Sequence, residues 1–171
     1  MNMKKFVLNS LLLAIGALLH QITPPLVLGM KPDFSLVMLF IVILYNEDFK
    51  SCITAGLVIG IFSALTTGFP AGQLPNIIDK IITTTIVYFS MRAFAGKAKE
   101  QILMMIIIAL GTLISGIVFL SSAAFIAGLP GSFNVLLVTI VLPAALINTV
   151  VGMVLYNAVR ISIKRSNYKI D

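Results

Sequence analysis

The sequence predicts an all-α integral membrane protein, a bundle of six transmembrane helices that forms a single domain over residues 1–171. Apolar residues make up 59% of the chain and charged residues 11%, against about a quarter in an ordinary soluble domain. So few charged groups cannot cover so apolar a core, and lipid is therefore the expected solvent. The apolar stretches are continuous rather than alternating, which favours helices over a β-barrel.

Six apolar stretches define the expected spans, at residues 6–28, 34–45, 51–67, 77–94, 102–127 and 133–161. Because a bilayer core of roughly 30 Å needs about 20 helical residues, the second and third spans are shorter than this length and the last two are longer. We expect the short spans to be buried within protein or to lie where the bilayer is thin. The first span follows two lysines, as in a signal peptide, but no small-residue cleavage site follows His20, so a retained helix is expected.

The basic residues predict the orientation in the membrane. If the six spans alternate, ten of the twelve Lys and Arg residues fall on one side. Only Lys31 lies in an opposite loop and only Lys80 within a span. The positive-inside rule then places both termini in the cytoplasm. This interpretation accounts for the net charge of +6, and no nucleic-acid partner is expected because the basic residues do not cluster with aromatic residues.

Several kinds of chemistry are absent from the sequence. There is no G-x-x-x-x-G-K-[ST] phosphate loop, no nucleophile motif and no metal-binding motif, and Cys52 is the single cysteine. We therefore expect no enzyme activity, no metal and no other cofactor. Uptake of a solute against its gradient would need either an ion coupling or an ATPase supplied by other subunits.

Polar residues that enter the fourth span are the main candidates for a binding site, since ionisable groups in a membrane are costly unless paired or solvated. Asn76, Asp79 and Thr83 share one helical face, while Lys80 is displaced by about 100°. Because adjacent positions do not face each other, Asp79 and Lys80 are expected to find separate partners. One interpretation is a structural network at the outer rim, with Lys31 paired to Asp79 and Asp33 to Lys80. The other is that the two charges receive a zwitterionic amino acid, and the two interpretations are compatible.

Each of the other candidate residues has a structural and a functional interpretation. His20 is a polar residue at a helix end or a ligand, and it has no second histidine with which to bind a metal. Asn148, in the sixth span, either bridges two helices or contacts a substrate. Phe69, in the second outer loop, either anchors at the interface or stacks on an aromatic ligand. Small residues at four-residue spacing, Gly56 and Gly60 among them, predict close packing of the third span.

Five segments resemble one protein family, the tryptophan transporter TrpP family. They read HQITPP from position 20, GMKPD from 29, ALTTGFPAGQLPNIIDK from 64, GTLISGIVFLS from 111 and VLPAALINT from 141. The resemblance extends over nearly the whole chain.

This resemblance implies a substrate-binding S component of an energy-coupling factor (ECF) transporter, a six-helix, multi-pass subunit of the bacterial cell membrane that captures tryptophan outside. Its implied partners are one coupling transmembrane subunit and two ATPase subunits, besides membrane lipid. Family S components dock through an Ala-xxx-Ala motif on the first helix, and Ser10 and Ala14 occupy that motif here, with serine in place of the first alanine. ATP hydrolysis in the partners then topples the loaded subunit.

On this basis we expect a pocket in which Asp79 binds the substrate ammonium and Lys80 the carboxylate. Gln73 and Asn76 would hydrogen-bond the indole N–H or the amino-acid head, and Phe69 would stack on the indole. The full set of candidate substrate-binding residues is Asp79, Lys80, Asn76, Gln73, Phe69, His20, Lys31 and Asn148. Two other classes stay open: a stand-alone ion-coupled amino-acid carrier, and a membrane assembly protein that binds no small ligand.

Overall fold

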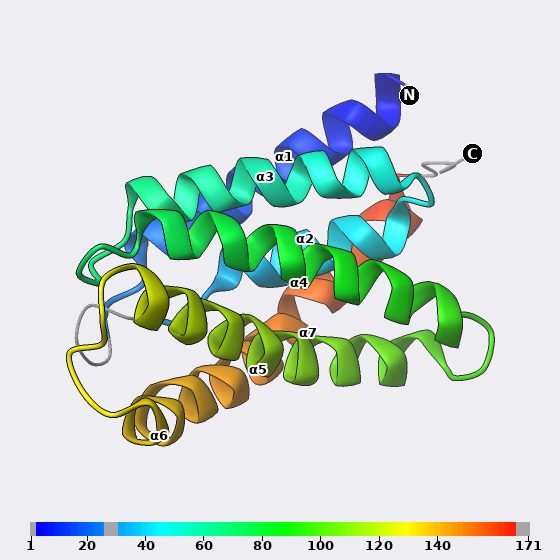
Figure 1. The fold of residues 1–171 in the computed structure, drawn as a ribbon. Helices are drawn as coiled ribbons and strands as arrows, with labels where there is room; N and C mark the ends of the chain where they lie inside the picture. The colour runs from blue at the N-terminus through cyan, green and yellow to red at the C-terminus, as the bar shows by residue number, and fades with distance from the viewer. Residues whose placement is uncertain (1–2, 26–30, 167–171) are drawn as a thin grey trace.

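The computed structural model describes residues 3–25 and 31–166, and these are helical apart from their connections (Figure 1). The helices are α1 (Met3–Ile22), α2 (Phe34–Tyr45), α3 (Phe49–Leu65), α4 (Gln73–Phe94), α5 (Glu100–Ile126), α6 (Phe133–Leu136) and α7 (Leu142–Arg165). A π-helical segment, Leu137–Val141, joins α6 to α7, so the last three pieces form one continuous run. No strand occurs among the residues described.

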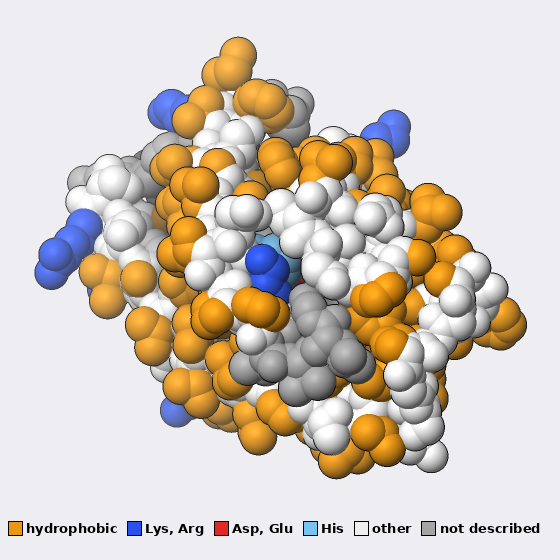
Figure 2. Space-filling view, turned by 90° about the vertical axis from the view of Figure 1, so that its left-hand side faces the viewer, with side chains coloured by type: hydrophobic (Ala, Val, Ile, Leu, Met, Phe, Trp, Pro, Cys, Tyr) orange, Lys and Arg blue, Asp and Glu red, His pale blue; other side chains and the backbone are white. Residues whose placement is uncertain are grey.

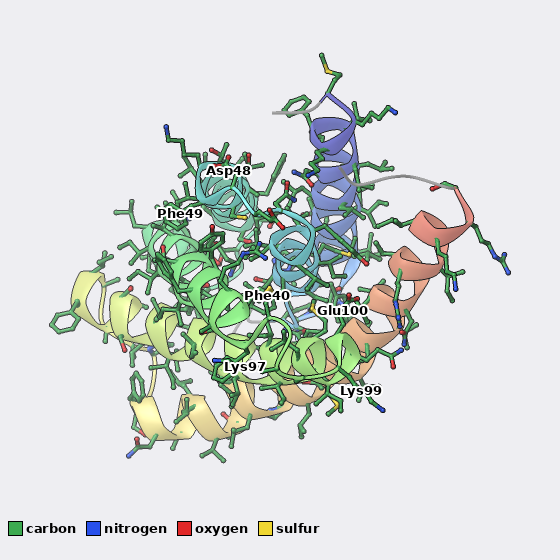
Figure 3. The ribbon with its side chains drawn as sticks, turned by 90° about the vertical axis from the view of Figure 1, so that its right-hand side faces the viewer. Phe40, Asp48, Phe49, Lys97, Lys99 and Glu100 are labelled. Carbon is green, nitrogen blue, oxygen red and sulfur yellow. The ribbon has the colours of Figure 1, made fainter. Side chains whose placement is uncertain are left out.

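The helices run from one end of the molecule to the other. The start of α1 and the end of α7 lie at the same end, on the right of Figure 1, which we call the terminal end. Asp48 and Phe49, at the start of α3, and Lys97, Lys99 and Glu100, between α4 and α5, also lie there (Figure 3). The α3–α4 and α5–α6 connections lie at the opposite end, which we call the cavity end.

Helix α2 is the centre of the bundle. Every residue from Leu36 to Ile43 is at most 1% exposed. A helix that is apolar all round is stable only when it is buried on all sides, and α2 packs against α1, α3, α4, α5 and α7. Its 12 residues span about 18 Å, less than a bilayer core. Helix α2 has the ends predicted for the second apolar stretch, and it is buried inside the protein, as its shortness predicted.

The other spans differ at their ends from the prediction, for reasons of backbone chemistry. Helix α1 stops at Ile22 rather than continuing to 28, because Pro24 and Pro25 lack the amide hydrogens that would extend it; positions 26–28 lie outside the described residues. Helix α4 begins at Gln73, four residues before the predicted start, because Pro75 is tolerated in a first turn. Helices α3 and α5 differ from the prediction by one or two residues at each end, and the run from α6 to α7 begins at the predicted residue, Phe133, and ends four residues later than predicted, at Arg165.

The π-helical segment has a local cause. Pro143 has no amide hydrogen and cannot donate to the carbonyl oxygen four residues earlier. The Leu142 N–H donates instead to the Leu137 carbonyl oxygen, five residues back, which widens the helix at this point.

Three helical runs are long and apolar enough to cross a membrane: Met3–Ile22, Glu100–Ile126 and Phe133–Arg165. Large apolar side chains also cover the outside of the described bundle; Leu146 is 71% exposed and Phe125 is 93% exposed. So extensive an apolar exterior is typical of a surface that faces lipid. Helix α4 is long enough to span, but it carries Asp79, Lys80 and Arg92.

Small residues bring α3 and α4 into close contact, as their spacing predicted. A Cβ atom placed on Gly60 would lie 3.2 Å from Ile77 Cα and 3.3 Å from Lys80 Cβ. The approach is closer at Gly56, where an added Cβ atom would lie 2.3 Å from Thr84 Oγ1. The α3 backbone therefore meets the α4 backbone at Gly60 and the Thr84 side chain at Gly56.

Gly56→Ala is expected to lower the melting temperature of the detergent-solubilised protein. Overpacking costs about 1–3 kcal/mol, which outweighs the gain of up to about 1 kcal/mol in helix propensity. Removing the Thr84 hydroxyl and methyl group with Thr84→Ala should restore most of the loss. An unchanged melting temperature for Gly56→Ala, or no rescue by the second change, would contradict this packing.

Candidate substrate-binding site

A cavity of about 80 Å³ lies at the cavity end, between the last turn of α1 and helices α2 to α5. Figure 2 looks onto this end and shows blue and pale-blue side chains in a hollow near the centre of the face, bordered by white and orange atoms. The lining residues are His20, Lys31, Asp33, Leu36, Ser63, Thr67, Phe69, Asn76, Asp79, Lys80, Thr112, Ser115, Gly116, Phe119 and Val141.

Lys80 is the centre of a buried ion network in this cavity. Its Nζ lies 2.6 Å from Asp79 Oδ2 and 2.7 Å from Asp33 Oδ2. His20 Nδ1 lies 3.2 Å from Asp33 Oδ1. One ammonium is therefore shared by two carboxylates, one from the start of α2 and one from α4.

The pairing corrects part of the sequence analysis. The Lys80–Asp33 contact was expected, but Asp79 and Lys80 also pair directly, although adjacent helical positions point about 100° apart. The long, flexible lysine stem lets the ammonium reach back to its neighbour even though the two Cβ atoms diverge. Among the described residues, Lys31 forms no ion pair with Asp79.

Hydroxyl groups complete the environment of Asp79, which is 1% exposed. Thr83 Oγ1, one turn along α4, donates to Asp79 Oδ1 at 2.9 Å. Ser115 Oγ, on α5, donates to Asp79 Oδ2 at 2.8 Å. A buried carboxylate is tolerated only when its oxygens are paired in this way.

Asp33 belongs both to the network and to the start of α2. Its Oδ1 accepts hydrogen bonds from the Leu36 N–H at 3.0 Å and from Ser35 Oγ at 2.5 Å, and so caps the helix. Burial acts to raise the pKa of Asp33, but the charges of Lys80 and His20 outweigh it and hold the pKa well below its usual value. The carboxylate is therefore ionised at neutral pH.

An aromatic pair borders the same cavity. The rings of Phe69, in the α3–α4 connection, and Phe119, on α5, lie edge to face, with centroids 5.2 Å apart and planes at 78°. The Thr67 side chain fixes the connection, because its Oγ1 accepts a hydrogen bond from the Phe69 N–H at 3.2 Å. Cationic, anionic and aromatic groups thus converge on one small cavity, which suits an amino acid with an aromatic side chain.

Comparisons with known proteins agree with this chemistry. The profile of the tryptophan transporter TrpP family matches residues 2–164. The chain belongs to this family. A probable tryptophan transport protein of Clostridium acetobutylicum is 54% identical over 164 residues, covering 96% of each chain. Relatives named in the same way from Clostridium perfringens and Bacillus subtilis are 47% and 45% identical, each over at least 96% of both chains.

No solved structure matches this TrpP family chain. Membership in a transport family, together with three apolar helical runs of spanning length, identifies a multi-pass membrane protein. The resemblance noted in the sequence is thereby confirmed.

Five of the expected site residues border the cavity of this TrpP family member alongside Lys80: His20, Lys31, Phe69, Asn76 and Asp79. Gln73 is exposed at the start of α4 and is not among the lining residues. Asn148 is not among the lining residues and is fully buried. Its Nδ2 donates a hydrogen bond to Thr112 Oγ1, a lining residue, at 3.4 Å, and this bond bridges α7 and α5.

Several lining residues were not singled out from the sequence. Thr112, Ser115 and Phe119 share one face of α5 at spacings of three and four residues. This face was the available signal, because two hydroxyls and an aromatic ring lie on it in the middle of a mainly apolar helix.

Ser10 and Ala14 lie away from the cavity. Both are exposed on α1, and they border a groove of about 500 Å³ between α1 and α3. The groove is lined mainly by apolar atoms, and Phe6, Val58 and Phe62 contribute to it.

Proposed function

We propose that this chain is the substrate-binding membrane subunit for tryptophan uptake, energised by a partner ATPase module as the S component of an ECF transporter. The observation that carries the proposal is the cavity, in which the Asp33–Lys80–Asp79 network lies beside the Phe69–Phe119 pair. Family membership and the names of the relatives support tryptophan as the substrate.

The charges of the cavity fit a zwitterionic head. Two carboxylates share the Lys80 ammonium, so the trio carries a formal excess of one negative charge. The ammonium of the amino acid would bind Asp79 and its carboxylate would bind Lys80, with Lys31 and His20 at the rim. The indole would pack against Phe69, and Asn76 would offer its amide.

The cavity must widen to accept this ligand. Its volume of about 80 Å³ is well below the roughly 300–1,000 Å³ of typical ligand sites. Binding would therefore separate side chains that now touch, and the Phe69–Phe119 contact is the nearest to the aromatic end.

The proposed setting is a bacterial cell membrane, with one domain of six spans and both termini cytoplasmic. The start of α1 and the end of α7 share the terminal end with the basic residues of the α4–α5 connection. That arrangement supports a cytoplasmic terminal end under the positive-inside rule, and the cavity would then face outward. The bacterial sources of the relatives support the location.

The deciding experiment is equilibrium tryptophan binding to the purified chain in detergent or nanodiscs, with other amino acids as competitors. Selective binding without any partner is the expected result. Absence of binding in demonstrably folded protein would reject the proposal in favour of an assembly protein.

Docking on the partner module is proposed through Ser10 and Ala14, whose small side chains leave the α1–α3 groove open to a partner helix. Ala14→Leu is therefore expected to leave tryptophan binding unchanged and to lower ATP-driven uptake at least about tenfold, a coupling loss of about 1.4 kcal/mol. Uptake is measured in proteoliposomes that contain the chain with its partners.

Ala124→Leu is the matched control, because Ala124 is exposed on α5 and lies outside the groove. It should change neither binding nor uptake. Gradient-driven uptake by the chain alone, insensitive to Ala14→Leu, would instead identify a stand-alone ion-coupled carrier.

A further inference from the structure

Ser63, on α3, carries a buried hydroxyl at the cavity. It is 1% exposed, and its Oγ is unpaired among the described residues. The neighbouring hydroxyls of the lining are engaged: Ser115 donates to Asp79, Thr112 accepts from Asn148, and Thr67 accepts from the Phe69 N–H. A buried hydroxyl without a hydrogen-bond partner costs free energy. Because Ser63 borders a cavity, a ligand bound there would supply the missing partner.

The register of the helices places Ser63 between the two parts of the cavity. Gly60 lies against Lys80, and Ser63 follows three residues, about 4.5 Å, farther toward the connection that carries Phe69. On α5, Phe119 follows Ser115 by four residues, about 6 Å, in the same direction. Ser63 is therefore level with the region between the ion network and the aromatic pair.

We propose that Ser63 Oγ accepts a hydrogen bond from the indole N–H of the bound tryptophan and sets the preference for indole over rings without a donor. This inference rests on the proposed function. With the charged head of the ligand on the Asp79–Lys80 pair, the indole N–H is the remaining donor of the ligand. Among the residues that line the cavity, Ser63 carries the remaining unpaired hydroxyl, since the unpaired Thr84 hydroxyl does not border it. Sites built to hydrogen-bond a ligand group discriminate against analogues that lack it.

Asn76 is the rival acceptor. It borders the cavity, and its Nδ2 donates to the Gly72 carbonyl oxygen at 2.8 Å. That bond fixes the amide at the first turn of α4, with its Oδ1 as the group that would compete for the indole N–H.

The test compares tryptophan with 3-(3-benzothienyl)alanine, in which sulfur replaces the indole N–H while the ring shape is kept. Ser63→Ala is expected to weaken tryptophan binding roughly three- to tenfold and to change binding of the sulfur analogue by less than about twofold. Ser63→Cys, which keeps the size but supplies a weak acceptor, should show the same selective loss. Melting temperatures confirm that each variant is folded.

Thr54→Ala is the control on the same helix, because Thr54 is exposed and donates to the Lys50 carbonyl oxygen. It should affect neither ligand. Equal losses for both ligands in Ser63→Ala, or no loss, overturn the role of Ser63, and a selective loss in Asn76→Ala alone assigns that role to Asn76. If folded wild-type protein binds neither ligand, the proposed function fails together with this inference.

Discussion

Lys80→Met is expected to destabilise the protein by about 3–5 kcal/mol and to abolish tryptophan binding, because it leaves Asp33 and Asp79 without their shared cation. Asp79 is 1% exposed and cannot turn to solvent. Thermal unfolding in detergent should show a drop of roughly 10 °C for a chain of this length.

Asp79→Asn provides the comparison for Lys80→Met. Lys80 keeps Asp33 at 2.7 Å, and the asparagine amide can accept from Ser115 Oγ through its oxygen and donate to Thr83 Oγ1 through its NH2 group. The loss of stability should therefore be smaller, while tryptophan binding falls at least about tenfold, or 1.4 kcal/mol.

The double variant completes the test, because Asp79→Asn removes one of the two carboxylates that Lys80→Met leaves unpaired. It should melt at a higher temperature than Lys80→Met alone. A Lys80→Met protein as stable as the wild type, or a double variant no better than the single one, would show that the network contributes little.

The helices were largely predictable because their signals are local. Helix α2 has the predicted ends since Asp33 caps its first turn and Asn46 follows its last residue. The π-helical segment was not predictable from apolar periodicity, because it depends on which carbonyl oxygen accepts the hydrogen bond from the Leu142 N–H, next to Pro143.

The charges of the site and the Lys80–Asp33 pair were predictable, and the other partners were not. Asp79 and Lys80 stand out in an apolar span, and their charges together with the likeness to a family gave the role that is proposed for them. Ser115 and Phe119 reach the cavity only because α5 packs on α4 in one register, and a single sequence does not reveal which helices are neighbours. Ser63 is ordinary by sequence, and its unpaired state exists only in the folded chain.

Close packing between α5 and the π-helical segment shapes one side of the cavity. Gly116 and Val141 both line it, and a Cβ atom on Gly116 would lie 2.3 Å and 2.8 Å from the two Cγ atoms of Val141 and 3.1 Å from its Cβ. Valine in a helix has one strongly preferred rotamer and cannot swing away cheaply. An added methyl group must therefore push the π-helical segment outward.

Gly116→Ala is accordingly expected to weaken tryptophan binding at least about tenfold and to cost about 1–3 kcal/mol of stability. Shortening the opposing side chain with Val141→Ala should restore most of the tryptophan affinity and most of the stability. Gly131→Ala is the matched control, because the nearest atom to its added Cβ is 3.9 Å away, on Leu136. Calorimetric binding and thermal unfolding measure the two effects, and wild-type affinity in Gly116→Ala would show that this contact does not shape the site.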